Sequence, residues 1–318
     1  MSFKEKVKPY FEPIADGLFG KQRGSSRGGP QLAPVAPRPI GQMMEDLLRV
    51  DEEGWGTYAF SRDPLNRKFT PEKRLELTQK ANACGREYAQ KISQQYGTSD
   101  PTELAKKMGM LVEYPEMPKS AARVLFAEYK APNHIYLYMD AVRKARTTLI
   151  EPGVKAVLTP KLDIGSLLLA HELFHYVEET NKKEIFTRTE KVELWAPKPL
   201  HNRSTIGCLG EIAAMEFART LTDLPYSPYL MDVFLVYGYS QDAAVRLYEE
   251  IMGLAGQRPS APETYAPAGE LNKTAGTRRD PRPGLLFCIS VHSAAMTEIF
   301  TRYSGIASAP CVTLRAGS

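Results

Sequence analysis

No segment limits the folds open to this chain as strongly as the pentapeptide HELFH, which runs from His171 to His175. On a helix, two residues four positions apart lie about 40° apart around the axis, one turn above the other. Both imidazoles can then reach one metal ion, and Glu172 can direct its carboxylate toward a water molecule at the open position of that ion. Two ligands and a general base at this spacing predict a zinc site with hydrolytic chemistry.

The residues around this pentapeptide predict a buried helix. Four apolar residues, LLLA, precede it, and Phe174, Tyr176 and Val177 make most of the remaining helix surface apolar. Two histidines and a glutamate in such a helix need polar partners, and a metal with its surrounding side chains provides them. A pair of core histidines without a metal is the alternative interpretation.

A catalytic zinc site usually takes three protein ligands, so one ligand must come from elsewhere. Glu178 lies on the same helix face as His171 but about 10 Å along the axis, which is too far for both to bind one ion. We therefore expect Glu178 to lie behind the ligands or at the surface. The longer metzincin motif is excluded, because it requires glycine at position 178 and histidine at position 181, where this chain has Glu178 and Asn181.

The segment LGEIAAMEFARTL, residues 209–221, offers two acids as a third ligand. Glu211 shares its helix face with Ala214 and Ala218, and small residues on that face let two helices approach closely. Glu216 points about 140° away from Glu211, and an acid there is more often solvated or ion-paired. Helix geometry therefore favours Glu211 over Glu216.

With three further segments, these motifs resemble the IrrE/ImmA-like zinc metallopeptidases of bacteria and their mobile genetic elements. The further segments follow the family's order: a helix and strand at 100–114, a strand at 134–140, and a closing helical pair at 236–253. The resemblance covers roughly residues 71–256.

The resemblance implies an α+β, zincin-like metallopeptidase domain, in which a small mixed sheet packs on the HExxH helix and on the second ligand helix. It implies that His171, His175 and Glu211 bind Zn²⁺ and that Glu172 is the catalytic base. It also implies a protein or peptide substrate, such as a transcriptional repressor or an antitoxin-like regulator. The alternative is a metal-binding regulatory or scaffold protein with little turnover, since Phe174 stands where the family usually has a small residue.

Composition argues against several other classes of protein, namely nucleic-acid-binding, secreted and membrane proteins. The 41 basic and 37 acidic residues are interspersed, and residues 1–70 show no helix-turn-helix pattern, so we expect no direct binding of nucleic acid. Four widely spaced cysteines without a CxxC pair are typical of free thiols in a reducing compartment. Because the chain has no apolar leader and no run of about 18 apolar residues, we expect a cytoplasmic protein that does not enter a membrane.

Two segments rich in proline and glycine, at 20–39 and 257–285, divide the chain. We expect a flexible N-terminal extension at 1–70, the metallopeptidase domain at 71–256, and a C-terminal linker with a short apolar segment at 257–318.

Two segments inside the domain have clear periodicity. Residues 71–96 form a long amphipathic stretch that leads into the core. In HIYLYMD (134–140), Ile135, Leu137 and Met139 alternate with more polar residues, which predicts a half-buried strand. Its role stays open between an edge strand that pairs with an extended substrate and an ordinary strand of the core sheet.

The 35 residues at 176–210, between the ligand helices, are expected to form a rim or lid over the site, because structureless loops of this length are uncommon unless functional. His201, Arg203 and Tyr176 are candidate donors to a developing oxyanion, and none of the three is preferred.

Overall fold

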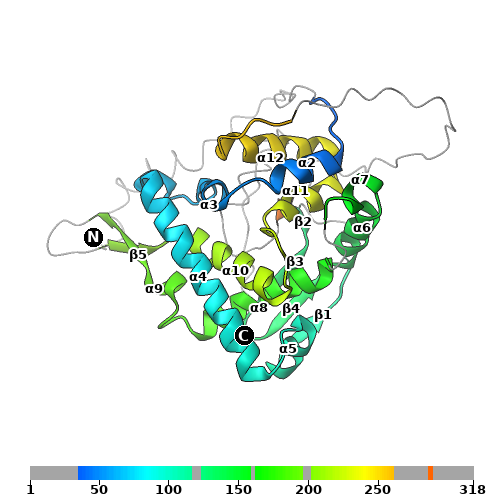
Figure 1. Cartoon of the computed structure of the whole chain (residues 1–318). Coiled ribbons are helices and arrows are strands. Elements are labelled where there is room, and N and C mark those ends of the chain that lie inside the picture. Colours follow the sequence, from blue (N-terminus) through cyan, green and yellow to red (C-terminus); the bar gives the residue numbers. More distant parts are fainter. Residues whose placement is uncertain (1–34, 117–122, 159–161, 196–201, 261–285, 289–318) are drawn as a thin grey trace, which may run out of the picture. The chain divides into compact units, whose positions relative to one another are not determined.

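The computed structural model describes residues 35–116, 123–158, 162–195, 202–260 and 286–288 (Figure 1). They form an α+β structure with a small mixed sheet, so this part of the predicted fold class is confirmed. Both expected ligand helices are present, as α8 (Ile164–Thr180) and α10 (Cys208–Leu221). None of the described helices is long and apolar enough to cross a membrane.

Three short strands form the mixed sheet in the order β1-β4-β3. β4 (His134–Leu137) lies in the middle, parallel to β1 (Leu111–Glu113) and antiparallel to β3 (Ala127–Lys130). Because both of its sides are paired, β4 is not an edge strand, and the interpretation of 134–140 as a substrate-pairing edge is wrong. Its alternative, an ordinary strand of the core sheet, is confirmed.

The predicted strand at 134–140 is also too long. Ile135 and Leu137 are buried, as the alternation predicted. Met139, however, is the first residue of α6 (Met139–Leu149). The alternating pattern continued into the helix because its first residues happen to follow the same order of apolar and polar side chains.

Two further strand pairs lie outside this sheet. β2 (Arg123–Leu125) pairs in parallel with β7 (Leu286–Cys288), and β5 (Lys191–Trp195) pairs antiparallel with β6 (Asn202–Thr205). β7 is the only described part of the C-terminal apolar segment. The other residues of that segment lie outside the described part of the chain.

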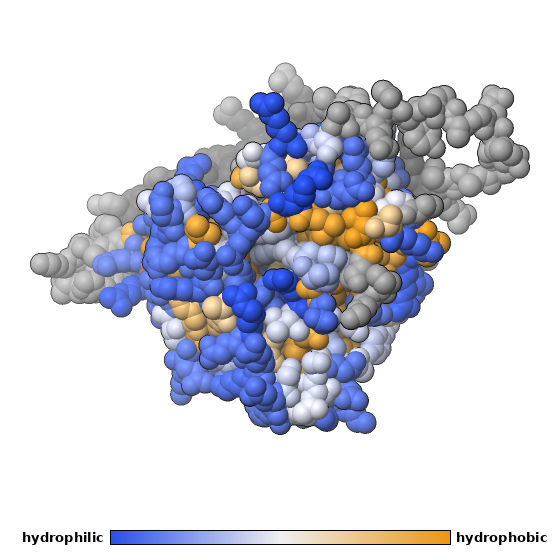
Figure 2. Space-filling view, viewed as in Figure 1, coloured by the Kyte–Doolittle hydropathy of each residue, from blue (hydrophilic) through white to orange (hydrophobic). Residues whose placement is uncertain are grey.

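The longest helix, α4 (Pro71–Tyr96), has the bounds of the predicted amphipathic stretch. Thr70 caps its first turn by accepting a hydrogen bond from the backbone N–H of Lys73. Gly97, with φ of 68°, ends the helix in the left-handed conformation that glycine adopts easily. One face of α4 packs on α10, whereas Figure 2 shows a largely hydrophilic outer face along this helix.

Two helices precede α4 and share its core, which differs from the expected flexible extension at 1–70. Six residues of α2 (Ile40–Leu47) and six of α3 (Glu52–Ser61) are buried. α2 contacts α11 and α12, and α3 contacts α4, α10 and α12. The predicted domain at 71–256 therefore leaves out two helices that belong to the same compact unit. The sequence pattern missed α2 and α3 because each helix has few apolar residues and lies close to segments rich in proline and glycine.

The remaining described helices surround these elements: η1 (Asn66–Lys68), α5 (Pro101–Lys107), α7 (Pro152–Lys155), α9 (Phe186–Thr189), α11 (Leu230–Tyr237) and α12 (Gln241–Leu254). α5 and β1 confirm the helix and strand expected at 100–114. Of the closing pair expected at 236–253, α12 matches that range, whereas α11 begins at Leu230 and only its last two residues fall inside it. Segment 176–210 contains the end of α8, then α9, β5 and β6, so its described residues are largely structured. Its role as a rim or lid stays a prediction.

Candidate metal centre

The helix that carries HELFH is buried along most of its length. α8 begins after Asp163, whose side chain accepts a hydrogen bond from the N–H of Ser166 at 2.7 Å. His171, Glu172 and His175 are 3%, 1% and 5% exposed. Their burial agrees with the apolar flanks of the motif, and it places three ionisable groups where each needs a partner.

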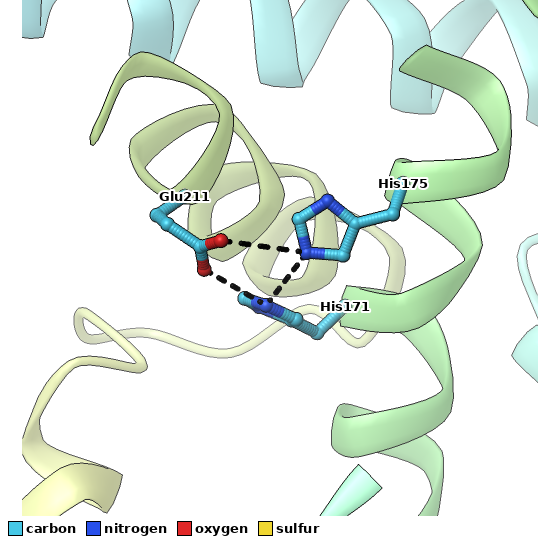
Figure 3. Close-up of side chains that lie close together, drawn as sticks. All are labelled: His171, His175 and Glu211. Carbon is cyan, nitrogen blue, oxygen red and sulfur yellow. Dashed lines mark hydrogen bonds and ion pairs between the residues drawn. The ribbon is translucent and has the colours of Figure 1, made fainter. Parts of the chain in front are cut away.

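Three side chains converge where α8 faces α10 (Figure 3). The Nε2 atoms of His171 and His175 are 3.3 Å apart. Glu211 of α10 places Oε2 at 3.4 Å from Nε2 of His171 and Oε1 at 3.8 Å from Nε2 of His175. One ligand atom from each residue can be chosen so that all lie within 4.8 Å of one another.

These distances suit a tetrahedral ion. Zinc binds histidine nitrogen and carboxylate oxygen at about 2.0–2.2 Å, which places neighbouring ligand atoms about 3.3–3.6 Å apart. Two histidines and a carboxylate are also a ligand set that catalytic zinc sites use. Among the residues that the structure describes, only these three form a cluster of histidine, cysteine or acidic side chains able to hold a metal. The donor set fits zinc, and in a tetrahedral site these three described residues would leave one position for water.

The two acids considered on α10 have separate positions. Glu211 lies with the histidines, whereas Glu216 pairs with Arg86 of α4 at 2.7 Å and with Arg219 at 3.2 Å. Of the two expectations for Glu216, solvated or ion-paired, the second is confirmed, since this side chain is buried.

Glu178 lies behind His175. This is the first of its two expected positions, which were behind the ligands or at the surface. Its Oε2 is 4.0 Å from Nδ1 of His175, and it is held by the Thr187 hydroxyl at 2.6 Å and by Arg188 at 2.9 Å. Burial alone would raise the pKa of Glu178, but these three neighbours outweigh burial and lower it. Gly210 makes room for this carboxylate, because a Cβ there would lie 2.8 Å from its Oε1.

The carboxylates around His175 create a site that favours a cation. Burial would lower the pKa of His175, but Glu211, Glu178 and Glu172 raise it to about 9. A negative potential that stabilises a protonated imidazole also stabilises a metal ion in the same place.

Glu172 contacts the sheet. Its Oε2 accepts a hydrogen bond from the backbone N–H of Tyr129 on β3 at 2.7 Å, and its Oε1 is buried without a hydrogen-bond partner among the described residues. Burial raises the pKa of this carboxyl group, which suits a general base. Since the Tyr129 N–H points to α8, the side of β3 that β4 does not pair faces the motif helix.

The three candidate oxyanion donors differ in their surroundings. The ring of Tyr176 packs edge-on against that of Tyr129, with centroids 6.2 Å apart. Arg203 is exposed on β6. His201 lies outside the described residues. Neither of the two described candidates, Tyr176 and Arg203, has a hydrogen bond or ion pair with the cluster, and the choice among the three stays open.

Sequence reasoning missed a buried group beside the centre. Asp232 of α11 is 1% exposed, and the Tyr58 hydroxyl donates to its Oδ2 at 2.7 Å. Burial raises the pKa of Asp232 to about 7, against the effects of Tyr58, Arg62 and His171. The sequence signal that could have revealed it was an aspartate inside the apolar segment LMDVFLVY. An acid buried in such a helix needs a partner, so it marks a polar contact in the core.

Comparisons of the chain with protein-family models, with curated proteins and with solved structures found no match. Function is therefore inferred from the residues of this centre.

Proposed function

We propose that this protein is a zinc-dependent metallopeptidase with a zincin-like fold, similar to the IrrE/ImmA-like enzymes, and that it hydrolyses a peptide bond in a protein substrate. The convergence of His171, His175 and Glu211 on one point carries the proposal. The position of Glu172, next in sequence to the first ligand and buried beside it, supports a hydrolytic role.

In this mechanism, His171, His175 and Glu211 would hold the zinc ion, which supplies Lewis acidity toward the scissile carbonyl and toward a water molecule. Glu172 accepts the proton of the attacking water and then delivers it to the leaving nitrogen. The hydrogen bond from Tyr129 fixes one oxygen of Glu172. The other oxygen, Oε1, is left to exchange the proton.

An extended substrate would pair with β3 (Ala127–Lys130). β3 has β4 on one side, and the N–H of Tyr129 on its other side reaches Glu172. A peptide added along this side would therefore pass beside the general base.

The resemblance supports a regulator as substrate, such as a repressor or an antitoxin-like protein. We propose action in the cytoplasm, without direct binding of nucleic acid. The buried free thiols of Cys84 and Cys208 agree with a reducing compartment.

The alternative is a metal-binding regulatory or scaffold protein with little turnover, and Phe174, which stands where the IrrE/ImmA-like family usually has a small residue, favours it. A structural metal site is closed by a fourth protein ligand, whereas a catalytic site keeps that position open. The described part of the chain offers three ligands at this point, which supports the enzyme.

The two functions are separated by measuring zinc and cleavage on the same sample. The full chain, loaded with zinc, is incubated with a library of unstructured peptides, and new termini are identified by mass spectrometry. We expect cleavage by the unaltered chain and a loss of about 10²- to 10⁴-fold in Glu172→Gln, because the amide cannot accept a proton. Glu172→Gln should retain its zinc. Stoichiometric zinc without cleavage by the unaltered chain would favour the scaffold instead.

A further inference from the structure

We propose that Asp232 of α11, held by Tyr58 of α3, is the positioning residue that orients the imidazole of His171 toward the metal. The inference rests on the proposed metal site and adds a residue that lies outside both ligand helices. It also makes the N-terminal helix α3 part of the machinery that builds the centre.

The carboxylate of Asp232 is fixed in a dry environment. Tyr58 is 1% exposed, and its hydroxyl donates to Oδ2 of Asp232 at 2.7 Å. The Tyr58 ring packs edge-on against Tyr229 at 5.7 Å and against Trp55 at 6.0 Å, and these two rings stack on each other at 5.7 Å. A hydroxyl fixed in this way sets the direction of the carboxylate that it binds.

His171 and Asp232 have complementary atoms that lack partners. Nδ1 of His171 and Oδ1 of Asp232 are both buried, and neither has a hydrogen-bond partner among the described residues. The two groups interact electrostatically. Buried polar atoms of this kind are normally paired, so an unpaired donor and an unpaired acceptor on two groups that interact point to a contact that forms when the metal is bound.

The second histidine supports the same assignment. A histidine that binds a metal usually donates its other ring N–H to a carboxylate or carbonyl, which fixes the tautomer and the ring direction. His175 has Glu178 at its Nδ1. For His171, Asp232 is the corresponding acid: with Nδ1–H donated to Oδ1, the lone pair of Nε2 is directed at the metal.

The test is the zinc affinity of Asp232→Asn, measured in the full chain by competition with a chelator of known affinity. The amide keeps an oxygen at one of the two carboxylate positions and places an NH2 donor at the other, so it cannot accept from Tyr58 at one position and from His171 at the other. We expect affinity to fall by about 10- to 100-fold, as for other residues that orient a metal ligand. The visible absorption of the Co²⁺-loaded variant should change as well, because the direction of the His171 ring changes.

A matched control separates this effect from a loss of packing. Asp46 of α2 is also an aspartate with 0% exposure that accepts from a tyrosine hydroxyl, that of Tyr248. Its charged and polar neighbours are Arg49, Ser260 and Tyr248, none of which belongs to the centre. Asp46→Asn should therefore lower the thermal midpoint while leaving zinc affinity within about twofold.

A second variant keeps the carboxylate of Asp232 and removes only the hydrogen bond that Tyr58 donates to it. Tyr58→Phe should weaken zinc binding less than Asp232→Asn does, because Asp232 remains but is no longer oriented. Zinc affinity unchanged in Asp232→Asn, or lowered equally in Asp46→Asn, would overturn the positioning role and leave the peptidase proposal intact. No zinc binding by the unaltered chain would overturn the proposed function itself.

Discussion

Three glutamates lie near His171 and His175, and their contacts give each a different role. Glu211 reaches both Nε2 atoms from another helix. Glu178 lies on the far side of His175 and is held by two side chains of the α9 region. Glu172 is bound to a backbone N–H of β3. The proposed metal ligand, orienting acid and general base thus differ in position more than in chemistry.

At this scale we predict that Glu211→Gln loses most of its zinc, because a neutral amide is a poor ligand for zinc. Elemental analysis of the purified chain should give about one zinc for the unaltered protein and far less for the variant. Glu216→Gln, on the same helix but paired with Arg86 and Arg219, should keep its zinc. Full occupancy in Glu211→Gln would refute the ligand set.

The helices meet at close range where α4 crosses α10. Gly85 of α4 allows this, because a Cβ there would lie 2.3 Å from the carbonyl oxygen of Ala213 and 3.0 Å from the nitrogen of Phe217. Both atoms belong to the backbone of α10, which cannot move without displacing the helix that carries Glu211. The close contact therefore helps to set how deep in the core Glu211 lies.

We predict that Gly85→Ala destabilises the protein by about 1–3 kcal/mol, the usual cost of overpacking, in spite of the higher helix propensity of alanine. Gly253→Ala in α12 is the control, since a Cβ there meets nothing within 4 Å. It should stabilise by about 0.5–1 kcal/mol. Denaturant unfolding of both variants measures the two effects, and the same sign for both would contradict the packing explanation.

α2 and α12 are joined by Asp46, which gives a prediction on pH. Burial would raise the pKa of Asp46, but hydrogen bonds from Ser260 and Tyr248 and the charge of Arg49 lower it. An aspartate with a lowered pKa stabilises the fold above its unfolded value of about 3.9, and that stabilisation is lost as the pH falls through the folded value.

The destabilisation caused by Asp46→Asn should therefore be largest at neutral pH and shrink as the solution becomes acidic. Urea unfolding of both chains between pH 7 and about pH 3 measures this difference. A constant difference over that range would show that the charge of Asp46 contributes nothing.

Over the whole molecule, the N-terminal helices bind the core at several points. Tyr58 donates to Asp232, and Arg62 forms a paired contact with Glu250 of α12 at 2.8 and 3.1 Å. Met43, in α2, is fully buried. Removing these helices exposes the apolar surfaces of α11 and α12 that they cover.

We therefore predict that a chain limited to residues 71–256 aggregates or melts far below the full protein, although the sequence pattern placed the domain within these bounds. A chain that begins at residue 35 keeps α2 and α3 and should retain its thermal midpoint and its zinc. Circular dichroism melts and zinc content of the two truncated chains decide this. Equal melting of both would restore the domain boundary at residue 71.

The sequence alone determined the features that depend on neighbouring residues. The spacing of His171, Glu172 and His175 and the amphipathic pattern of 71–96 are local, and helix geometry converts both directly into structure. The choice of Glu211 over Glu216 also followed from the rotation per residue. Its convergence with the histidines agrees with that choice.

Only the tertiary structure decided which strand lies at an edge, where the domain begins and which side chain binds Asp232. β4 looked like a possible edge, yet β3 is the strand that contacts Glu172. Tyr58 and Asp232 are 174 positions apart in the chain, and no periodic pattern links them. Such contacts depend on how distant elements pack, because a side chain's neighbours across the core are not encoded in its own local segment.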